Sequence, residues 1–259
     1  MARRVLDLSR QWLPQGWLDA LRQLLVFGAA YYAYRLVRGI VDGQVTSAFA
    51  HARDVIAIER GMHLFFEARV QDWVDRVGWL EDAADFMYVN SQFMVTTTFI
   101  VWLYLARNSS FYYVRNMFAV AMVLALVGYI VFPTAPPRYM PEWGFHDSVT
   151  DFVGDGAANS AAALYNPFAA VPSMHVAFAL MVGIPCAVLV RSRVLKVLWC
   201  FYPVLITFVV IATANHFWFD AVTGALVAGI AAATAHAALA RARPDAWSFR
   251  RPLGAEAPL

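Results

Sequence analysis

Charged residues are scarce in this sequence, and lysine is almost absent. Asp, Glu, Lys and Arg make up 15% of the 259 residues and apolar residues make up 61%, whereas soluble domains carry roughly a quarter charged residues. A soluble protein of this size can bury one large core, but it cannot hide several uninterrupted apolar runs of about 20 residues, each long enough to span a bilayer. The composition therefore excludes an ordinary soluble domain and predicts a chain embedded in lipid.

Three further shortages narrow the possible classes of protein. Lys196 is the only lysine and no polybasic run occurs, so a nucleic-acid partner is not expected. Cys186 and Cys200 lie inside apolar runs without metal-ligand or disulfide spacing, which favours two buried apolar thiols. The start of the chain lacks a compact apolar core followed by a small-residue cleavage site. We therefore expect no cleaved signal peptide.

Several apolar runs are candidates for membrane-spanning helices. They are residues 23–40, 83–106, 116–132, 174–190, 194–212 and 219–240. These runs predict an all-α fold, a six-helix transmembrane bundle with short extensions at both ends. We expect one membrane domain over residues 23–240, between an N-terminal segment at 1–22 and a tail at 241–259.

Most positive charges fall on one side of the threaded spans. Thirteen of the twenty cations lie on the side of the two termini, which the positive-inside rule makes cytoplasmic. The loops at 41–82, 133–173 and 213–218 should then face outward from a cell (plasma) membrane. The loop at 133–173 is rich in Gly, Pro, Ala, Asn and Asp, and its length is typical of functional lids.

The segment between the first two spans has the pattern of one amphipathic helix, from Ile58 to Val77. The apolar set is Ile58, Met62, Phe65, Phe66, Val70, Trp73 and Val77, and the polar set is Glu59, His63, Glu67, Gln71 and Asp75. This pattern predicts a helix lying in the outer membrane interface. The alternative is an ordinary amphipathic helix packed on the bundle, and periodicity alone leaves both open.

Asp220 is the only formally charged residue between Val197 and Ala240. A carboxylate at the centre of a membrane helix costs about 3 kcal/mol on insertion scales, so we expect a compensating partner. His216 lies four residues earlier and would share one helical face with Asp220. A hydrogen bond to one ring nitrogen would leave the other free as a nucleophile or base. The alternative is a polar pair wetted at a helix mouth.

A helix start is predicted immediately before the fourth span. Ser173 follows Pro172 and is a good N-cap, which leaves the amides of Met174 and His175 without intrahelical acceptors. Free amides at the start of a helix form an anion site, especially for phosphate. The alternative is a plain cap beside an interfacial histidine.

Arg138, at the outer end of the third span, has a planar fork of donors that suits phosphate oxygens. A lone arginine at this depth can also be a lipid-headgroup anchor. Tyr88, Asn90 and Asn215 are candidates to line a pocket, with ordinary interhelical hydrogen bonding as the alternative. The pair of His216 and Asp220, the capped helix start and the arginine all fall on the predicted outer side. Their convergence favours a site for an anionic substrate.

The same residues form three ordered motifs: FPTAPPR ending in Arg138, NPFAAVPSMH ending in His175, and TANHFWFD from Thr213 to Asp220. With these motifs the sequence resembles the phosphatidic acid phosphatase type 2 superfamily. Within it, the sequence most closely resembles the branch similar to inositol phosphorylceramide synthases. The resemblance runs from roughly the amphipathic segment to the sixth span.

The resemblance implies an integral membrane lipid-phosphate phosphatase or phospholipid head-group phosphotransferase. His216 would attack phosphorus and form a phosphohistidine, Asp220 would orient it, and His175 would protonate the leaving alcohol. The residues that would hold the phosphate oxygens are Arg138, Ser173 and Met174. The expected partners are a lipid phosphate or phospholipid, membrane lipids and, for a transferase, a polyol acceptor. No cofactor and no metal is expected.

Two positions depart from the family pattern. Val131 stands where the first motif usually begins with lysine, and Val210 stands where the third motif usually carries arginine. Met174 replaces a glycine of many relatives. The branch resembling inositol phosphorylceramide synthases often carries such changes, so we interpret them as differences between subfamilies.

Two other classes of function remain open from the sequence. One is a metalloenzyme that uses His175, His216 and Asp220 as a two-histidine, one-carboxylate metal site. The other is a non-catalytic lipid-headgroup binding or transport protein, in which the same polar residues only recognise a headgroup.

Overall fold

The computed structural model describes residues 13–41, 44–154 and 168–239. In these ranges the α-helices are α2 (Gly16–Val41), α3 (Val45–Gly61), α4 (Glu67–Asp75), α5 (Gly78–Ala106), α6 (Asn108–Val131), α7 (Ser148–Val153), α9 (Met174–Leu189), α10 (Arg193–Ala212) and α11 (Trp218–Thr234). The short helical turns are η1 (Pro137–Tyr139), η2 (Pro141–Trp143) and η3 (Ala235–Leu239). The described chain contains no strand beyond an isolated bridge, so the all-α prediction is confirmed.

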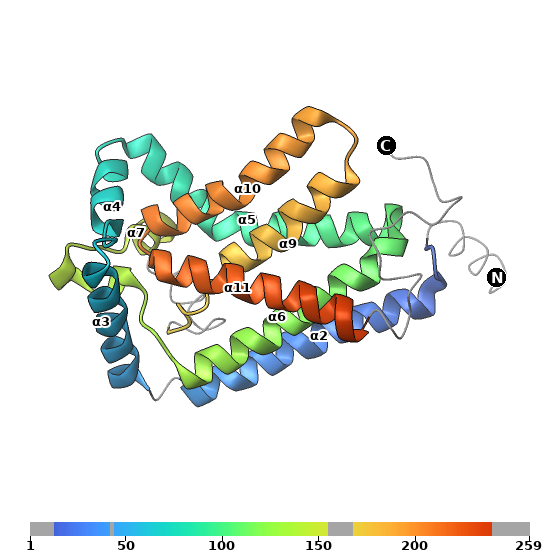
Figure 1. The fold of residues 1–259 in the computed structure, drawn as a ribbon, viewed down its shortest axis with the longest axis horizontal. Helices are drawn as coiled ribbons and strands as arrows, with labels where there is room; N and C mark the ends of the chain where they lie inside the picture. The colour runs from blue at the N-terminus through green and yellow to red at the C-terminus, as the bar shows by residue number, and fades with distance from the viewer. Residues whose placement is uncertain (1–12, 42–43, 155–167, 240–259) are drawn as a thin grey trace.

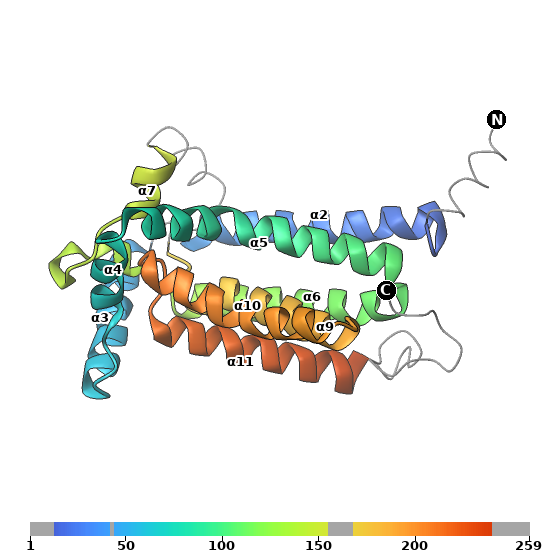
Figure 2. The same cartoon turned by 90° about the horizontal axis from the view of Figure 1, so that it is seen from above.

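The long helices run along one axis of the molecule, and two shorter helices lie across one end of them. Figures 1 and 2 show α2, α5, α6, α9, α10 and α11 in the long bundle, with α3 and α4 crosswise at one end. The largest buried cluster of apolar side chains lies between α5, α6, α9 and α11 and contains Phe111, Phe118 and Met181. The bundle therefore has an apolar core of its own beneath its apolar outer surface.

Four helices are long and apolar enough to cross a membrane. They are α5, α6, α10 and the stretch Trp218–Ala237, which begins with α11. The shorter helix α9 is equally apolar in character but has only 16 residues. All six predicted spans fall on helices, and α2 is a continuous helix of 26 residues. A membrane protein is thereby supported, and the count of six spans stays a prediction.

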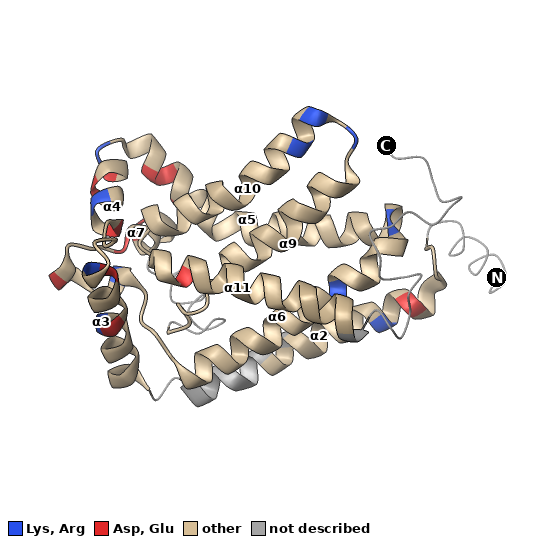
Figure 3. Ribbon diagram, viewed as in Figure 1, with Lys and Arg blue, Asp and Glu red and all other residues tan. Residues whose placement is uncertain are grey.

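Charged side chains gather at the two ends of the long helices. Figure 3 shows acidic and basic residues on and around α3 and α4 at one end, and Arg or Lys near the opposite end of α6 and α10. The middle of the bundle is nearly free of charge apart from Asp220 near the start of α11. This distribution fits an apolar middle layer between two polar surfaces.

The prediction of a single amphipathic helix over residues 58–77 is wrong. The chain forms α3 and α4 instead, separated by a turn in which His63 has a left-handed backbone (φ 57°) that no helix accommodates. The polar face points inward, because Glu59, Glu67 and Gln71 are buried. On the apolar face, Trp73 is 55% exposed. Periodicity found the two faces, but it did not reveal that the protein interior holds hydrogen-bond partners for the polar face.

A glycine allows α11 to pack directly on the start of α9. A Cβ atom at Gly224 would lie 2.2 Å from the carbonyl oxygen of Ser173. Ser173 also donates its backbone N–H to the carbonyl of Asp220 at 3.0 Å. The starts of the two helices are therefore fixed side by side.

The loop that follows α6 crosses this same end of the bundle. Ala135 donates its N–H to the carbonyl of Ala48 in α3, and Thr134 donates to the carbonyl of Phe168. Residues 155–167 of the predicted loop, residues 1–12 of the N-terminal segment and the predicted tail at 241–259 lie outside the described residues.

Candidate active site

His216 lies in a tight turn between α10 and α11. Ala214 has a left-handed backbone (φ 49°), and the carbonyl of Val210 accepts hydrogen bonds from the N–H groups of both Asn215 and His216 at 3.1 Å. His216 therefore precedes α11. The prediction that His216 and Asp220 share one helical face is wrong. The predicted contact still forms, because Asp220 in the first turn of α11 reaches back to the imidazole.

The imidazole of His216 is held through one nitrogen. Its Nδ1 lies 3.0 Å from the carbonyl oxygen of Ala170 and 3.3 Å from Oδ2 of Asp220. The carbonyl of Ala170 can only accept, and Oδ2 of Asp220 already accepts from the N–H of Phe217, so Nδ1 carries the proton and Nε2 keeps its lone pair. Burial lowers the pKa of His216 to about 3, and the positive charge of Arg138 acts in the same direction. The ring is therefore neutral at pH 7.

His175 faces this ring from the first turn of α9. The ring centroids of His175 and His216 lie 5.7 Å apart with an edge-on arrangement. Tyr88 of α5 stacks on the other side of His175 at 4.6 Å between centroids. Three elements distant in the sequence thus place two histidines and a tyrosine together.

Ser173 is the N-cap of α9, as the sequence predicted. Its Oγ accepts a hydrogen bond from the N–H of Val176 at 3.5 Å. By helix geometry the amides of Met174 and His175 have no intrahelical acceptor. The side chain of Met174 packs against the apolar core, so only its amide is available for an anion.

Arg138 is buried against the turn that carries His216. Its backbone N–H donates to the carbonyl of Ala214 at 2.8 Å, and its guanidinium donates to Oδ1 of Asn215. Nη2 donates to the hydroxyl of Tyr139 at 3.2 Å, and Nε lies 3.6 Å from a carboxylate oxygen of Asp147. Arg138 is only 6% exposed, which disfavours the alternative that it is a lipid-headgroup anchor on the surface.

One nitrogen of this guanidinium makes no hydrogen bond to the described residues. Nε of Arg138 is buried and has no hydrogen-bond partner among the described residues, since Asp147 is beyond hydrogen-bonding distance. A buried charged donor without a partner is costly in a folded protein. An anion that enters between Arg138 and the histidines would relieve that cost.

Two of the three residues predicted to line a pocket contact the site, and the third does not. Tyr88 and Asn215 contact the site residues, whereas the amide of Asn90 donates to the carbonyl of Phe86 in its own helix at 2.9 Å. Residues two apart in a helix point to different sides, so Asn90 does not follow Tyr88 toward His175. Asn90 is therefore not assigned to the site.

Sequence reasoning overlooked several neighbours of the site. Tyr139 and Asp147 contact Arg138, and the carbonyl of Ala170 contacts His216. Glu59 and Glu67 bind the first amides of α11. The acidic pair did belong to a recognisable polar helix face, but its burial has no signature in the sequence.

The two departures from the family pattern occupy different environments. Val131 is 72% exposed at the end of α6. Val210 is fully buried in α10, and its carbonyl organises the turn that carries His216. The second valine is therefore part of the scaffold of the site.

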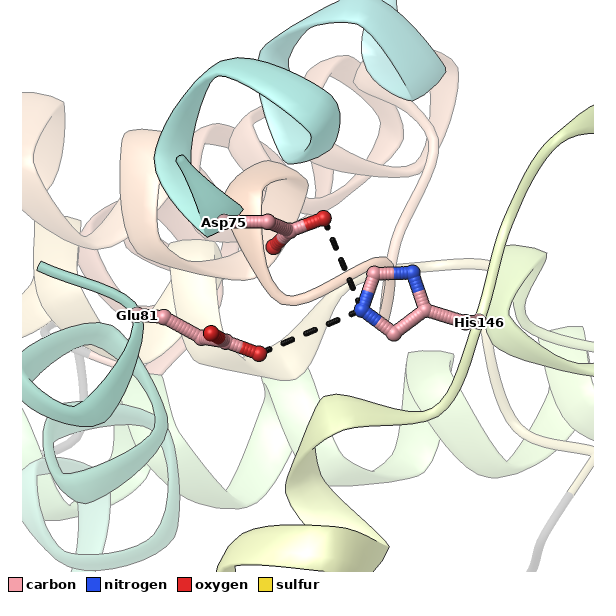
Figure 4. Close-up of side chains that lie close together, drawn as sticks. All are labelled: Asp75, Glu81 and His146. Carbon is pink, nitrogen blue, oxygen red and sulfur yellow. Dashed lines mark ion pairs between the residues drawn. The ribbon is translucent and has the colours of Figure 1, made fainter. Parts of the chain in front are cut away.

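A separate group of side chains has spacing that suits a metal ion. One ligand atom each from Asp75, Glu81 and His146 lies within 4.8 Å of the others, and Figure 4 shows the three side chains pointing toward one another. Nε2 of His146 is 3.5 Å from Asp75 and 4.0 Å from Glu81. Within the described ranges this is the only group of this kind, and it includes none of the residues of the predicted metalloenzyme site.

An all-helical membrane protein with a buried and a half-buried histidine beside a buried arginine and a capped helix start is suited to bind and act on an anion. A family model of the PAP2 superfamily matches residues 53–234, more than half of the chain. The chain therefore belongs to the PAP2 superfamily, which comprises phosphatases and phosphotransferases that act on lipid phosphates in membranes. Comparisons with curated proteins and with solved structures gave no significant match.

Proposed function

We propose that the protein is a membrane lipid-phosphate phosphatase or phospholipid head-group phosphotransferase that works through a phosphohistidine on His216. The observation that carries this proposal is the state of one imidazole. His216 is neutral, its Nδ1 is bound to two acceptors, and its Nε2 is left as the nucleophile. Nε of Arg138 is a buried donor that makes no hydrogen bond in the part of the chain that the structure describes. Membership of the PAP2 superfamily agrees with this chemistry.

The reaction follows from these positions in two steps. Nε2 of His216 forms a bond to phosphorus while the bond from phosphorus to the departing alcohol breaks, and His175 donates a proton to that alkoxide. Arg138 and the amides at the start of α9 hold the charged oxygens, and Asp220 stabilises the positive charge that develops on the ring. Water then attacks phosphorus and gives its proton to His175, while the bond from phosphorus to Nε2 of His216 breaks, so phosphate leaves and both histidines return to their starting state. A second alcohol, such as a polyol, would take the place of water in a transferase.

We further propose that six helices span the plasma membrane, with both termini cytoplasmic and the site at the outer face. The excess of cations on the side of the termini supports this orientation. The site lies at the end of the bundle that carries α3 and α4, away from Arg193 and Lys196 at the start of α10 (Figures 1 and 3). The relationship to inositol phosphorylceramide synthases belongs to the same proposal and rests on the three sequence motifs.

The experiment that tests the proposal is a release assay on a panel of phosphorylated lipids in detergent, with and without added polyols. The parent should release phosphate or form a new ester, and His216→Ala should do neither. His236→Ala is the matched control, because His236 is an exposed histidine outside the site. A phosphoenzyme that is labile in acid and stable in base should form only when His216 is present.

Two results would favour the other classes. Lipid binding by the parent without turnover on any substrate would support a headgroup-binding or transport protein. Turnover that disappears when a chelator is added and returns with a divalent metal would support a metalloenzyme. Retained turnover in His216→Ala would remove the covalent mechanism.

A further inference from the structure

Buried carboxylates bind each of the first amides of α11. The N–H of Phe217 donates to Asp220 at 2.9 Å, that of Trp218 to Glu67 at 3.0 Å, and that of Phe219 to Glu59 at 3.0 Å. The initial amides of a helix lack intrahelical acceptors, and a single nearby side chain or water usually satisfies them. Here two of the three acceptors come from other helices, α3 and α4.

These contacts bear directly on His216. The same oxygen of Asp220, Oδ2, accepts from Phe217 and faces Nδ1 of His216. The two amides held by Glu67 and Glu59 follow at the next two positions of the chain. A shift of this first turn would therefore move Asp220 relative to the imidazole.

The three carboxylates are fully buried, so they cannot all carry charge. The charged groups that face Glu59 are Glu67 from α4 and Asp220 from α11. Burial raises the pKa of Glu59 to about 9, and the nearby charge of Glu67 adds to the effect. Oε2 of Glu59 is buried without a hydrogen-bond partner among the described residues, which leaves one oxygen available for that proton.

We propose that Glu59 and Glu67 are positioning residues that hold the first turn of α11 in register with His216 and Asp220. This inference rests on the proposed phosphohistidine function. The two side chains touch backbone and not the reacting atoms, so they act through the turn. Small displacements of a catalytic group lower the rate by as much as about 100-fold without removing the group.

The proposal predicts that kcat falls at alkaline pH because Glu59 ionises. Below about pH 9 Glu59 keeps its proton and the turn is held. Above it a second buried negative charge appears beside Glu67, and the turn is pushed out of register. The kcat of the parent should therefore fall above about pH 9, with KM little changed because Arg138 is held by other contacts.

The test measures kcat and KM against pH for the parent, Glu59→Gln, Glu67→Ala and Glu67→Gln in detergent. Glu59→Gln should lower kcat only a few fold at pH 7 and abolish the fall above about pH 9, because a glutamine oxygen still accepts from Phe219 and cannot ionise. Glu67→Ala should lower kcat about 10- to 100-fold with KM changed less than about threefold. Glu67→Gln should restore part of that loss. Glu142→Gln, an exposed acid of the outer loop, is the matched control and should behave as the parent.

A second readout does not require turnover. Because the folded pKa of Glu59 is raised above its value of 4.5 in the unfolded chain, its contribution to stability is present below pH 4.5 and is lost as pH rises through about 9. The unfolding temperature of the parent should fall across this window, and Glu59→Gln should flatten the fall. A parent that turns over while Glu59→Gln keeps the same alkaline limb would overturn the positioning role and leave the proposed function intact. A parent without turnover on any lipid phosphate would overturn both.

Discussion

Replacing Arg138 with lysine keeps the positive charge and removes the planar fork. The guanidinium contacts Asn215 and Tyr139, and its buried Nε makes no hydrogen bond in the described part of the chain, so Nε can bind a phosphate oxygen while the other nitrogens hold the group in position. A lysine ammonium carries three donors at one point and cannot reproduce that geometry. The loss of one charge-assisted hydrogen bond costs about 1.5 to 3 kcal/mol, which corresponds to roughly a 10- to 150-fold fall in kcat/KM.

The assay for Arg138→Lys is steady-state hydrolysis of a lipid phosphate in mixed micelles. Arg69→Lys, an exposed arginine on α4, is the control and should match the parent. The unfolding temperature of each variant separates a lost contact from a lost fold. If Arg138→Lys turns over as fast as the parent, the planar guanidinium of Arg138 is not needed to bind phosphate and the phosphate pocket lies elsewhere.

Three further predictions concern the histidines, metal and helix packing. With a good leaving group such as a nitrophenolate, His175→Ala should keep much of its activity and Asp220→Asn should be intermediate. His216→Ala should be inactive on every substrate. Equal losses in all three variants would contradict separate roles. EDTA should leave turnover unchanged, because the proposed nucleophile is an imidazole; a loss reversed by added metal would contradict it. Gly224→Ala should cost about 1 to 3 kcal/mol of stability, because its Cβ would meet the backbone of the α9 N-cap. The control is Gly229→Ala on the same helix, whose Cβ would meet open space and should not destabilise the protein. Equal unfolding temperatures of the two variants would contradict this packing.

The helices were predictable because each depends on local signals. Uninterrupted apolar runs marked α5, α6, α10 and α11, and Ser173 after Pro172 marked the start of α9. The turn at His63 was not predictable, because a left-handed backbone at a non-glycine residue depends on what surrounds it. The pattern over 58–77 therefore continued through a break that the structure contains.

The site was predictable only in part. His216, His175 and Arg138 stood out because polar residues are rare in apolar surroundings, and the structure brings them to one end of the bundle. The backbone N–H groups that donate to Glu59 and Glu67 lie 160 and 151 residues away along the chain. No periodicity encodes contacts of such separation, so the burial of these two acids could be found only in three dimensions.

The carboxylate caps of α11 also constrain how the protein is made. Ribosomes deliver α3 and α4 long before Trp218 and Phe219, so during synthesis Glu59 and Glu67 have no amides to bind. Until then the acids remain hydrated at the membrane surface, because burial without partners would be costly. Arrival of the last helix dehydrates them and lets Glu59 take up a proton. Completion of the bundle is thereby coupled to the local pH, and the proposed nucleophile is assembled only when the last helix packs.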